Sequence, residues 1–403
     1  MKKNKQGKED TLTIACQAKI KASQEIKKQL QFISQGCSEV YNWALRRRIE
    51  CDKQGLKQPS KYQQAKKLVG LKKEKSWLNQ IPAWTLREVV INRVPNAWKK
   101  YEKRKSLYPK AGYPREKTEN GWHDSFSIHQ EGYQIKDNKI FISQGNYQGK
   151  RQSKIIIPFE LTNPLRGKTK IITISWKKNN WTLNIVCDIE LPPQMLKSEI
   201  KKILGIDRGV RKILATSEGQ KLLNPKYWNK VEKRYIELQK SLSRKIKGSN
   251  NWKKTKTKMG IIGKKTSNRM KDLCHKTSRQ LVDNNDLIAL EKLEPSKMFS
   301  KENKKIGKWI RDGMLKACWS QLAFFIVYKA KDAGKRYEYV SPINTSKRCS
   351  NIGCGKINKE LKDEEIFLCP SCGYSEDRDV NAAKNVRWKA EKKLKIGAFA
   401  PTG

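Results

Sequence analysis

The chain has 403 residues, of which 88 are lysine or arginine and 39 are aspartate or glutamate, so its formal net charge is +49. A chain of this length can form two or three domains with hydrophobic cores. Self-repulsion of so large a charge destabilises a compact state unless a polyanion neutralises it, so nucleic acid is the expected partner. The length argues against a short packaging protein of the ribosomal or chromatin type.

The sequence predicts a protein of the cytosol. Residues 1–10 carry charges without an apolar segment, so we expect no secretory signal. The longest apolar run, residues 317–330, is too short to span a membrane and favours a buried core helix. Unpaired cysteines elsewhere in the chain are typical of a reducing compartment. We expect a cytoplasmic protein in a bacterial-type cytosol, associated with the nucleoid when bound to its partner, with no membrane contact.

The amino-terminal half is expected to combine helices with an antiparallel sheet. Residues 11–19 alternate weakly, like a strand, and three helical patterns follow between residues 23 and 105. These helices have lysine- and arginine-rich faces, which indicate contact with nucleic acid, although a solvated charged surface is the alternative. From residue 134 the period changes to two, which predicts a small antiparallel barrel completed by the strand at 11–19.

A different unit begins near residue 204. Three antiparallel strands are predicted there, with Asp207 at the end of the first, as in an RNase H-like nuclease. A long basic helical stretch follows at 228–283, with a predicted interruption at 247–257. Residues 287–291 then form a buried strand that carries Glu291. A lone ionised glutamate is costly to bury unless it is paired or binds a cation, so this position is informative.

Four cysteines predict a structural metal site. Cys349 and Cys354 form a C-x4-C pair, and Cys369 and Cys372 form a C-x2-C pair after fourteen intervening residues. Glycine follows the second cysteine of each pair and allows the backbone to turn tightly around an ion. Four thiolates at this spacing match a tetrahedral Zn2+ site of the zinc-ribbon type. The alternative is four unrelated cysteines.

Three carboxylates are the candidate catalytic residues: Asp207, Glu291 and Asp379. Gathered without cations they would repel one another, whereas oxygen ligands of this kind suit Mg2+ or Mn2+. Two such ions can activate a water and stabilise the leaving oxygen in phosphodiester cleavage. Asp377 is the main competitor for the place of Asp379, since either could instead cap a helix. The other alternative is that all three acids are caps and turn residues.

Several motifs resemble the TnpB family, which is carried by insertion sequences and is related to the miniature type V CRISPR nucleases. The resemblance is specific over residues 203–390 and looser before residue 200. One departure is the C-x4-C pair, where C-x2-C is more usual in the family. The matching segments are YNWALRRR at 41–48, GIDRGV at 205–210, LIALEKL at 287–293, TSKRCSNIGCG at 345–355, CPSCG at 369–373 and DRDVNAAKN at 377–385.

The resemblance implies an α+β multidomain protein and a metal-dependent endodeoxyribonuclease. It implies a guide RNA that pairs with double-stranded target DNA beside a short flanking motif, and an active enzyme, because all three acids are retained. A miniature type V CRISPR effector, a guide-independent DNA transposase and a non-enzymatic regulator remain alternatives. The implied domains are a wedge-like β-barrel (1–22 and 106–200), a helical recognition lobe (23–105), a RuvC-like, RNase H-like nuclease (201–344 and 375–403) and an inserted zinc ribbon (345–374).

Overall fold

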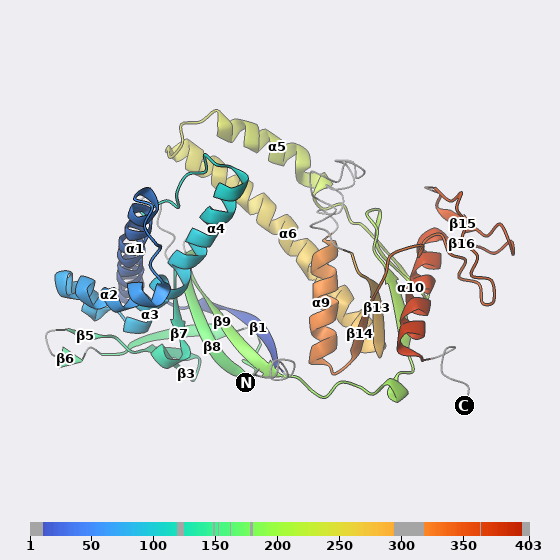
Figure 1. Ribbon diagram of the computed structural model, residues 1–403, viewed down its shortest axis with the longest axis horizontal. Helices are drawn as coiled ribbons and strands as arrows, with labels where there is room; N and C mark the ends of the chain where they lie inside the picture. The colour runs from blue at the N-terminus through green and yellow to red at the C-terminus, as the bar shows by residue number, and fades with distance from the viewer. Residues whose placement is uncertain are drawn as a thin grey trace. The chain divides into compact units, whose positions relative to one another are not determined.

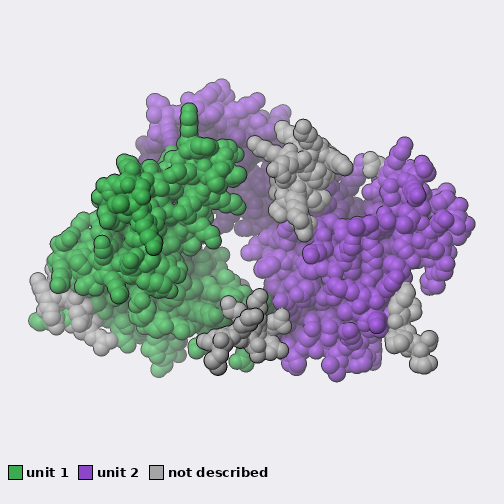
Figure 2. Space-filling model, viewed as in Figure 1, with its two compact units in different colours: residues 1–190 green, residues 191–403 purple. Residues whose placement is uncertain are grey.

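The computed structural model describes residues 11–118, 125–147, 150–151, 153–161, 163–177, 180–293, 318–362 and 364–396. The chain divides into two compact units, residues 1–190 and 191–403, which Figure 2 draws in different colours. Each unit has its own sheet and its own hydrophobic core. The fold is therefore mixed α and β, as the sequence predicts.

Unit 1 is built around an antiparallel sheet of seven strands in the order β2-β8-β9-β1-β7-β4-β3. The two edge strands β2 and β3 are joined by the three residues Gln130–Gly132, so the sheet curls back on itself and is nearly closed. A hairpin of β5 (Asn146–Tyr147) and β6 (Lys150–Arg151) extends from it. The seven strands are β1 (Thr11–Ile20), β2 (Ser125–His129), β3 (Tyr133–Lys136), β4 (Lys139–Ile142), β7 (Ile155–Leu161), β8 (Lys168–Lys177) and β9 (Asn180–Glu190).

The helices of unit 1 are inserted between β1 and β2, where the sequence predicts them, and Figure 1 shows them on one side of the sheet. Serine side chains cap the first two: Ser23 accepts from the backbone of Ile26, and Ser60 forms a capping box with Gln63. Helices and sheet bury their apolar side chains in one shared core. The helical segments are α1 (Gln24–Lys53), α2 (Lys61–Glu74), a 3-10 helix (Ser76–Gln80), α3 (Ala83–Glu88), a π-helical turn (Val89–Arg93) and α4 (Val94–Leu107).

Unit 2 contains a five-stranded sheet in the order β12-β11-β10-β13-β14. The strands β10, β11 and β12 are antiparallel neighbours, whereas β10, β13 and β14 run parallel to one another. Parallel neighbours need long crossover connections, which here include helices. The strands are β10 (Ile203–Asp207), β11 (Lys212–Thr216), β12 (Lys221–Leu223), β13 (Leu287–Glu291) and β14 (Arg336–Val340).

Within the described part of this unit, the α-helices are α5 (Asn229–Ser243), α6 (Asn250–Asn284), α9 (Trp319–Asp332) and α10 (Arg378–Leu394). The predicted interruption at 247–257 is wrong in its extent, because α6 already begins at Asn250. Ser249 accepts a hydrogen bond from the backbone of Trp252 at 3.2 Å and so fixes the start of α6. Within the described ranges, none of the helices is long and apolar enough to cross a bilayer.

The two faces of the parallel strands pack against different helices. Ile288 and Leu290 belong to a core shared with residues of α6 and α9, whereas Ala289 packs with Val386 and Ala390 of α10. Successive side chains of a strand point to opposite faces, so Glu291 shares the face of Ala289. The residue at the end of β13 therefore faces α10.

Gly205 on β10 allows α10 to lie against the same face, and this contact supports a prediction. A Cβ at Gly205 would lie 2.1 Å from the carbonyl oxygen of Ala383 and 2.6 Å from the amide nitrogen of Arg387. Gly205→Ala is expected to displace α10 and to lower the unfolding free energy by about 1–3 kcal/mol. Denaturant titration measures this. Gly260→Ala in α6, where a Cβ meets nothing within 4 Å, is the matched control and should not destabilise the chain.

Candidate active site

Two of the predicted carboxylates lie side by side at one edge of the unit 2 sheet. Strands β10 and β13 are parallel, and their register pairs Ile206 with Leu290. The next residue on each strand is Asp207 and Glu291, and both lie at the carboxyl ends of their strands. Alternation places both side chains on the face that α10 covers, because Gly205 and Ala289 contact that helix.

Burial and neighbouring charges shift the pKa values of both carboxyl groups. The pKa of Asp207 is raised to about 8, first by burial and then by the negative charges of Glu291 and Asp379. Burial also raises the pKa of Glu291 and outweighs three neighbours that act in the opposite direction: the hydroxyl of Thr345, which donates to Oε1 at 2.6 Å, and the charges of Arg208 and Lys389. Asp207 is therefore costly to ionise beside the other two acids, and a bound cation would relieve that cost.

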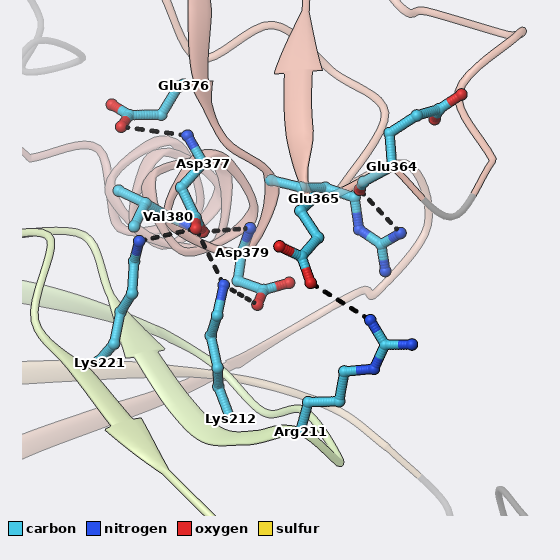
Figure 3. A network of polar contacts seen from close by, with 10 residues as sticks. Arg211, Lys212, Lys221, Glu364, Glu365, Glu376, Asp377, Asp379 and Val380 are labelled. Carbon is cyan, nitrogen blue, oxygen red and sulfur yellow. Dashed lines mark hydrogen bonds and ion pairs between the residues drawn. The ribbon is translucent and has the colours of Figure 1, made fainter.

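Asp379 lies in the first turn of α10, and Asp377 caps that helix (Figure 3). Oδ1 of Asp377 accepts from the backbone amides of Asp379 at 3.0 Å and of Val380 at 3.2 Å. Its Oδ2 accepts from Lys221 at 2.7 Å and from Lys212 at 2.9 Å. Both oxygens of Asp377 thus have structural partners. Burial alone would raise its pKa, but the hydrogen bonds outweigh burial and lower the pKa to about 2. Of the two aspartates, Asp379 is the one whose charge acts on Asp207.

The donor set of the three acids fits a hard divalent ion, because carboxylate oxygens are the ligands that Mg2+ and Mn2+ prefer. Glu291 is buried, and Asp207 and Asp379 keep partial access to solvent. Among the described residues, one group of His, Cys, Asp or Glu side chains lies close enough together to hold an ion as it stands, and that group is the four cysteines. The acids interact through their charges but are less tightly gathered.

The four predicted cysteines lie together, with ligand atoms all within 4.8 Å of one another. The Sγ atoms of Cys349 and Cys372 are 3.8 Å apart, and those of Cys354 and Cys369 are 3.6 Å apart. Tetrahedral coordination with Zn–S bonds of about 2.3 Å requires sulfur atoms about 3.8 Å apart, so the group fits a zinc ion. The longer C-x4-C knuckle is therefore compatible with metal binding.

Local backbone geometry holds the cysteines in place. The two glycines that follow the cysteine pairs, Gly355 and Gly373, have φ values of +63° and +69°, which a side chain would disfavour. The second cysteine pair lies between two antiparallel strands, β15 (Ile366–Leu368), which leads into it, and β16 (Ser375–Asp377), which leads from it to the start of α10. The chain thus passes from the knuckle into the helix that carries Asp379.

Two asparagines of α10 attach the knuckle to that helix. The amide of Asn381 donates to the backbone oxygen of Arg348 at 2.9 Å and accepts from the amide of Ser350 at 3.0 Å. Asn385 is completely buried and donates to the carbonyl oxygens of Thr345 at 3.0 Å and Arg348 at 2.6 Å. The Thr345 hydroxyl also donates a hydrogen bond to Glu291. The loop of residues 345–350 therefore connects the cysteines to a candidate catalytic acid.

Sequence reasoning did not identify three residues of this site. Arg208 is buried and donates to the backbone oxygen of Glu291 at 2.6 Å. Thr345 bonds the Glu291 carboxylate, and Lys212 contacts both Asp377 and Asp379. The position of Arg208 directly after Asp207 is a usable sequence signal. The partners of Thr345 and Lys212 are distant in the chain, and no local pattern indicates them.

The raised pKa of Asp207 predicts how stability depends on pH when Mg2+ and Mn2+ are absent. The unfolded chain loses this proton near pH 4, whereas the folded chain keeps it until about pH 8. The unfolding free energy should therefore fall as the pH rises through this window, by at most about 1.4 kcal/mol per pH unit. Denaturant titrations of the wild type and of Asp207→Asn measure this. The variant should lose that part of the pH dependence, and an unchanged slope would contradict the assignment.

Comparisons with known proteins give the family. The model described as "OrfB_IS605: Probable transposase" matches residues 185–302, and that of the "Cas12f1-like, TNB domain" matches residues 319–386. The chain is 26% identical over 381 residues to InsQ of Escherichia coli (strain K12), which is named as a proposed RNA-guided DNA endonuclease. That alignment covers 91% of this chain and 90% of the relative.

A solved structure and a second relative are also similar to this chain. A solved complex of Cas12f1 with sgRNA and target DNA has a TM-score of 0.54 at 18% identity, covering 91% of this chain and 83% of that one, and shows likeness of fold. The TnpB-like protein MJ0751 of Methanocaldococcus jannaschii is 30% identical over 254 residues, which are 62% of this chain and 78% of the relative. The match to this relative, of which the chain covers more than two thirds, shows that the chain belongs to the TnpB family.

Proposed function

We propose that this chain is an RNA-guided DNA endonuclease associated with an insertion sequence. One observation carries the proposal: Asp207 and Glu291 lie at the ends of adjacent parallel strands and face α10, the helix whose first turn contains Asp379. Membership of the TnpB family supports it, as does the net charge of +49, which suits a polyanionic partner.

The three acids are proposed to bind Mg2+ or Mn2+ in a RuvC-like, RNase H-like domain. Divalent ions held there would activate a water and stabilise the charge on the leaving oxygen of a phosphodiester. The protein side chains orient the ligands: Thr345 donates to Glu291 Oε1, and Arg208 donates to the Glu291 carbonyl oxygen. Asp207, with its raised pKa, can hold a proton on its carboxyl group near neutral pH until a cation replaces it.

The four cysteines are proposed to hold a structural Zn2+ in a zinc ribbon. All four ligands come from the protein, which is typical of a closed structural site with no open position for substrate. The role of this ion would be to fix the loop that contacts Asn381, Asn385 and Glu291. The metal content of the purified chain, measured by elemental mass spectrometry, should be one zinc per chain.

The specificity for the target DNA sequence is proposed to come from base pairing with the guide RNA rather than from side chains that contact base edges. A guide RNA would pair with one strand of double-stranded target DNA beside a short flanking motif, and the protein would hold the heteroduplex by shape and charge. The wedge-like barrel and the recognition lobe of the amino-terminal half are the proposed holders of these nucleic acids. Holding a duplex by its phosphate charge is consistent with basic residues that are spread through the whole chain.

Sequencing the RNA that co-purifies with the chain tests the proposal. One defined, structured RNA species is expected, and replacing its guide segment should redirect cleavage to the DNA that matches the new guide. A chain that cuts or joins DNA without RNA would instead favour the guide-independent transposase, which the description of the matching family model suggests. The genomic surroundings, transposon ends or a repeat array, separate the insertion-sequence nuclease from a miniature CRISPR effector.

A further inference from the structure

Lys212 connects the two aspartates at the start of α10. It is the first residue of β11, and its ammonium group lies 2.9 Å from Oδ2 of Asp377 and 3.0 Å from Oδ2 of Asp379 (Figure 3). Its side chain is only 19% exposed, so both ion pairs are partly shielded from water. Lys212 therefore neutralises a carboxylate that we assign to the metal site.

The two aspartates differ in what else they contact. Asp377 has its own lysine, Lys221 at 2.7 Å, and accepts from two backbone amides of α10. It would keep its position and its charge balance if Lys212 turned away. The carboxylate of Asp379 faces Lys212 in Figure 3, and its charge also acts on Asp207.

We propose that Lys212 is a resident counter-ion that competes with the divalent cation for Asp379 and so sets the metal concentration at which the active site fills. This inference rests on the proposed function, since it takes Asp379 as a metal ligand. An ammonium group and a divalent ion on one carboxylate repel each other strongly in a shielded site. The ion would therefore weaken the pair of Lys212 with Asp379, and Lys212 can keep the hydrogen bond that it already donates to Asp377.

The arrangement has a consequence for the protein before metal binds. Asp377, Asp379, Lys212 and Lys221 form a set whose charges balance, so the start of α10 carries no unpaired carboxylate. A divalent ion must then displace an existing ion pair rather than find a free ligand. Loading is expected to need a higher metal concentration than three free carboxylates would require.

Direct metal binding tests the proposal without reference to cleavage. The probe is Mn2+, titrated into the full-length, zinc-loaded chain after high salt has removed nucleic acid, with free Mn2+ measured by electron paramagnetic resonance. Lys212→Met keeps the apolar stem and removes the charge, and it should bind Mn2+ about tenfold more tightly than the wild type. Lys221→Met is the matched control, because Lys221 pairs with Asp377 and not with Asp379. The affinity of this variant for Mn2+ should stay within about twofold of the wild-type value.

The outcomes separate this inference from the proposed function. Unchanged or weaker Mn2+ binding by Lys212→Met would overturn the counter-ion role and indicate that Lys212 positions Asp379 instead. If Asp207→Asn and Asp379→Asn both leave Mn2+ binding unchanged, the assignment of the active site fails as well. Thermal melting establishes that each variant is folded. Lys212→Gln, which can still donate to Asp377, carries the same prediction should the methionine variant not fold.

Discussion

Asp207→Asn is expected to lower the rate of guided DNA cleavage at least about a thousandfold, because metal-ion stabilisation of the transition state contributes several kcal/mol. The substitution keeps the shape of the side chain but removes a negative charge from the group of three acids. The variant should still bind guide RNA and target DNA, since positive charge spread over the chain supplies that affinity. Single-turnover cleavage of end-labelled DNA and an electrophoretic mobility assay measure the two effects separately.

The matched control for this prediction is Asp286→Asn. Asp286 lies just before β13, at the opposite end of the strand from Glu291, and accepts from the backbone amides of Lys201 at 3.0 Å and Lys202 at 2.9 Å. An asparagine can still accept these bonds, so cleavage should remain close to the wild-type rate. Equal cleavage by Asp207→Asn and the wild type would show that the carboxylates at this sheet edge do not perform the chemistry.

Cys369→Ser is expected to release the metal from the cysteine group and to lower cleavage by about a hundredfold, the upper end of the range for lost support around a metal site. Cys369 is buried, and its sulfur lies 3.6 Å from that of Cys354. Without the ion, the loop that carries Thr345 loses its anchor. Glu291 then loses the hydroxyl that orients its carboxylate at 2.6 Å, and α10 loses the contacts of Asn381 and Asn385.

The measurements for this second prediction are metal content by elemental mass spectrometry and the cleavage rate under the same conditions. Cys16→Ser is the control, because Cys16 lies on β1 of unit 1, outside the metal group. It should leave both quantities unchanged. A Cys369→Ser protein that lacks the metal and still cuts DNA at the wild-type rate would mean that the knuckle does not support the active site.

Much of this site follows from local sequence patterns. The strands ending in Asp207 and Glu291 could be predicted because apolar runs end in a carboxylate, and the cysteine group because its spacing is typical of metal knuckles. The sequence predicts a tight turn at the glycine after each cysteine pair, and both glycines have a left-handed backbone there. These features depend on neighbours within a few residues.

What the sequence could not indicate depends on tertiary register. Lys212 meets Asp377 across 165 positions of chain, and Thr345 meets Glu291 across 54. Such pairs arise only when β11, β13 and α10 have been placed against one another. Which of Asp377 and Asp379 is the third candidate acid likewise depends on the folded structure. In the sequence the two aspartates look equivalent, whereas in the structure Asp377 is the N-cap of α10.

Anomalous diffraction from crystals of the chain soaked in Mn2+ tests the central claim most directly. We expect a manganese peak at the sheet edge, at about 2.2 Å from carboxylate oxygens of Asp207, Glu291 and Asp379, with the Lys212 ammonium group displaced toward Asp377. Manganese bound only at other acidic residues, with these three carboxylates still apart and Lys212 still on Asp379, would contradict the account.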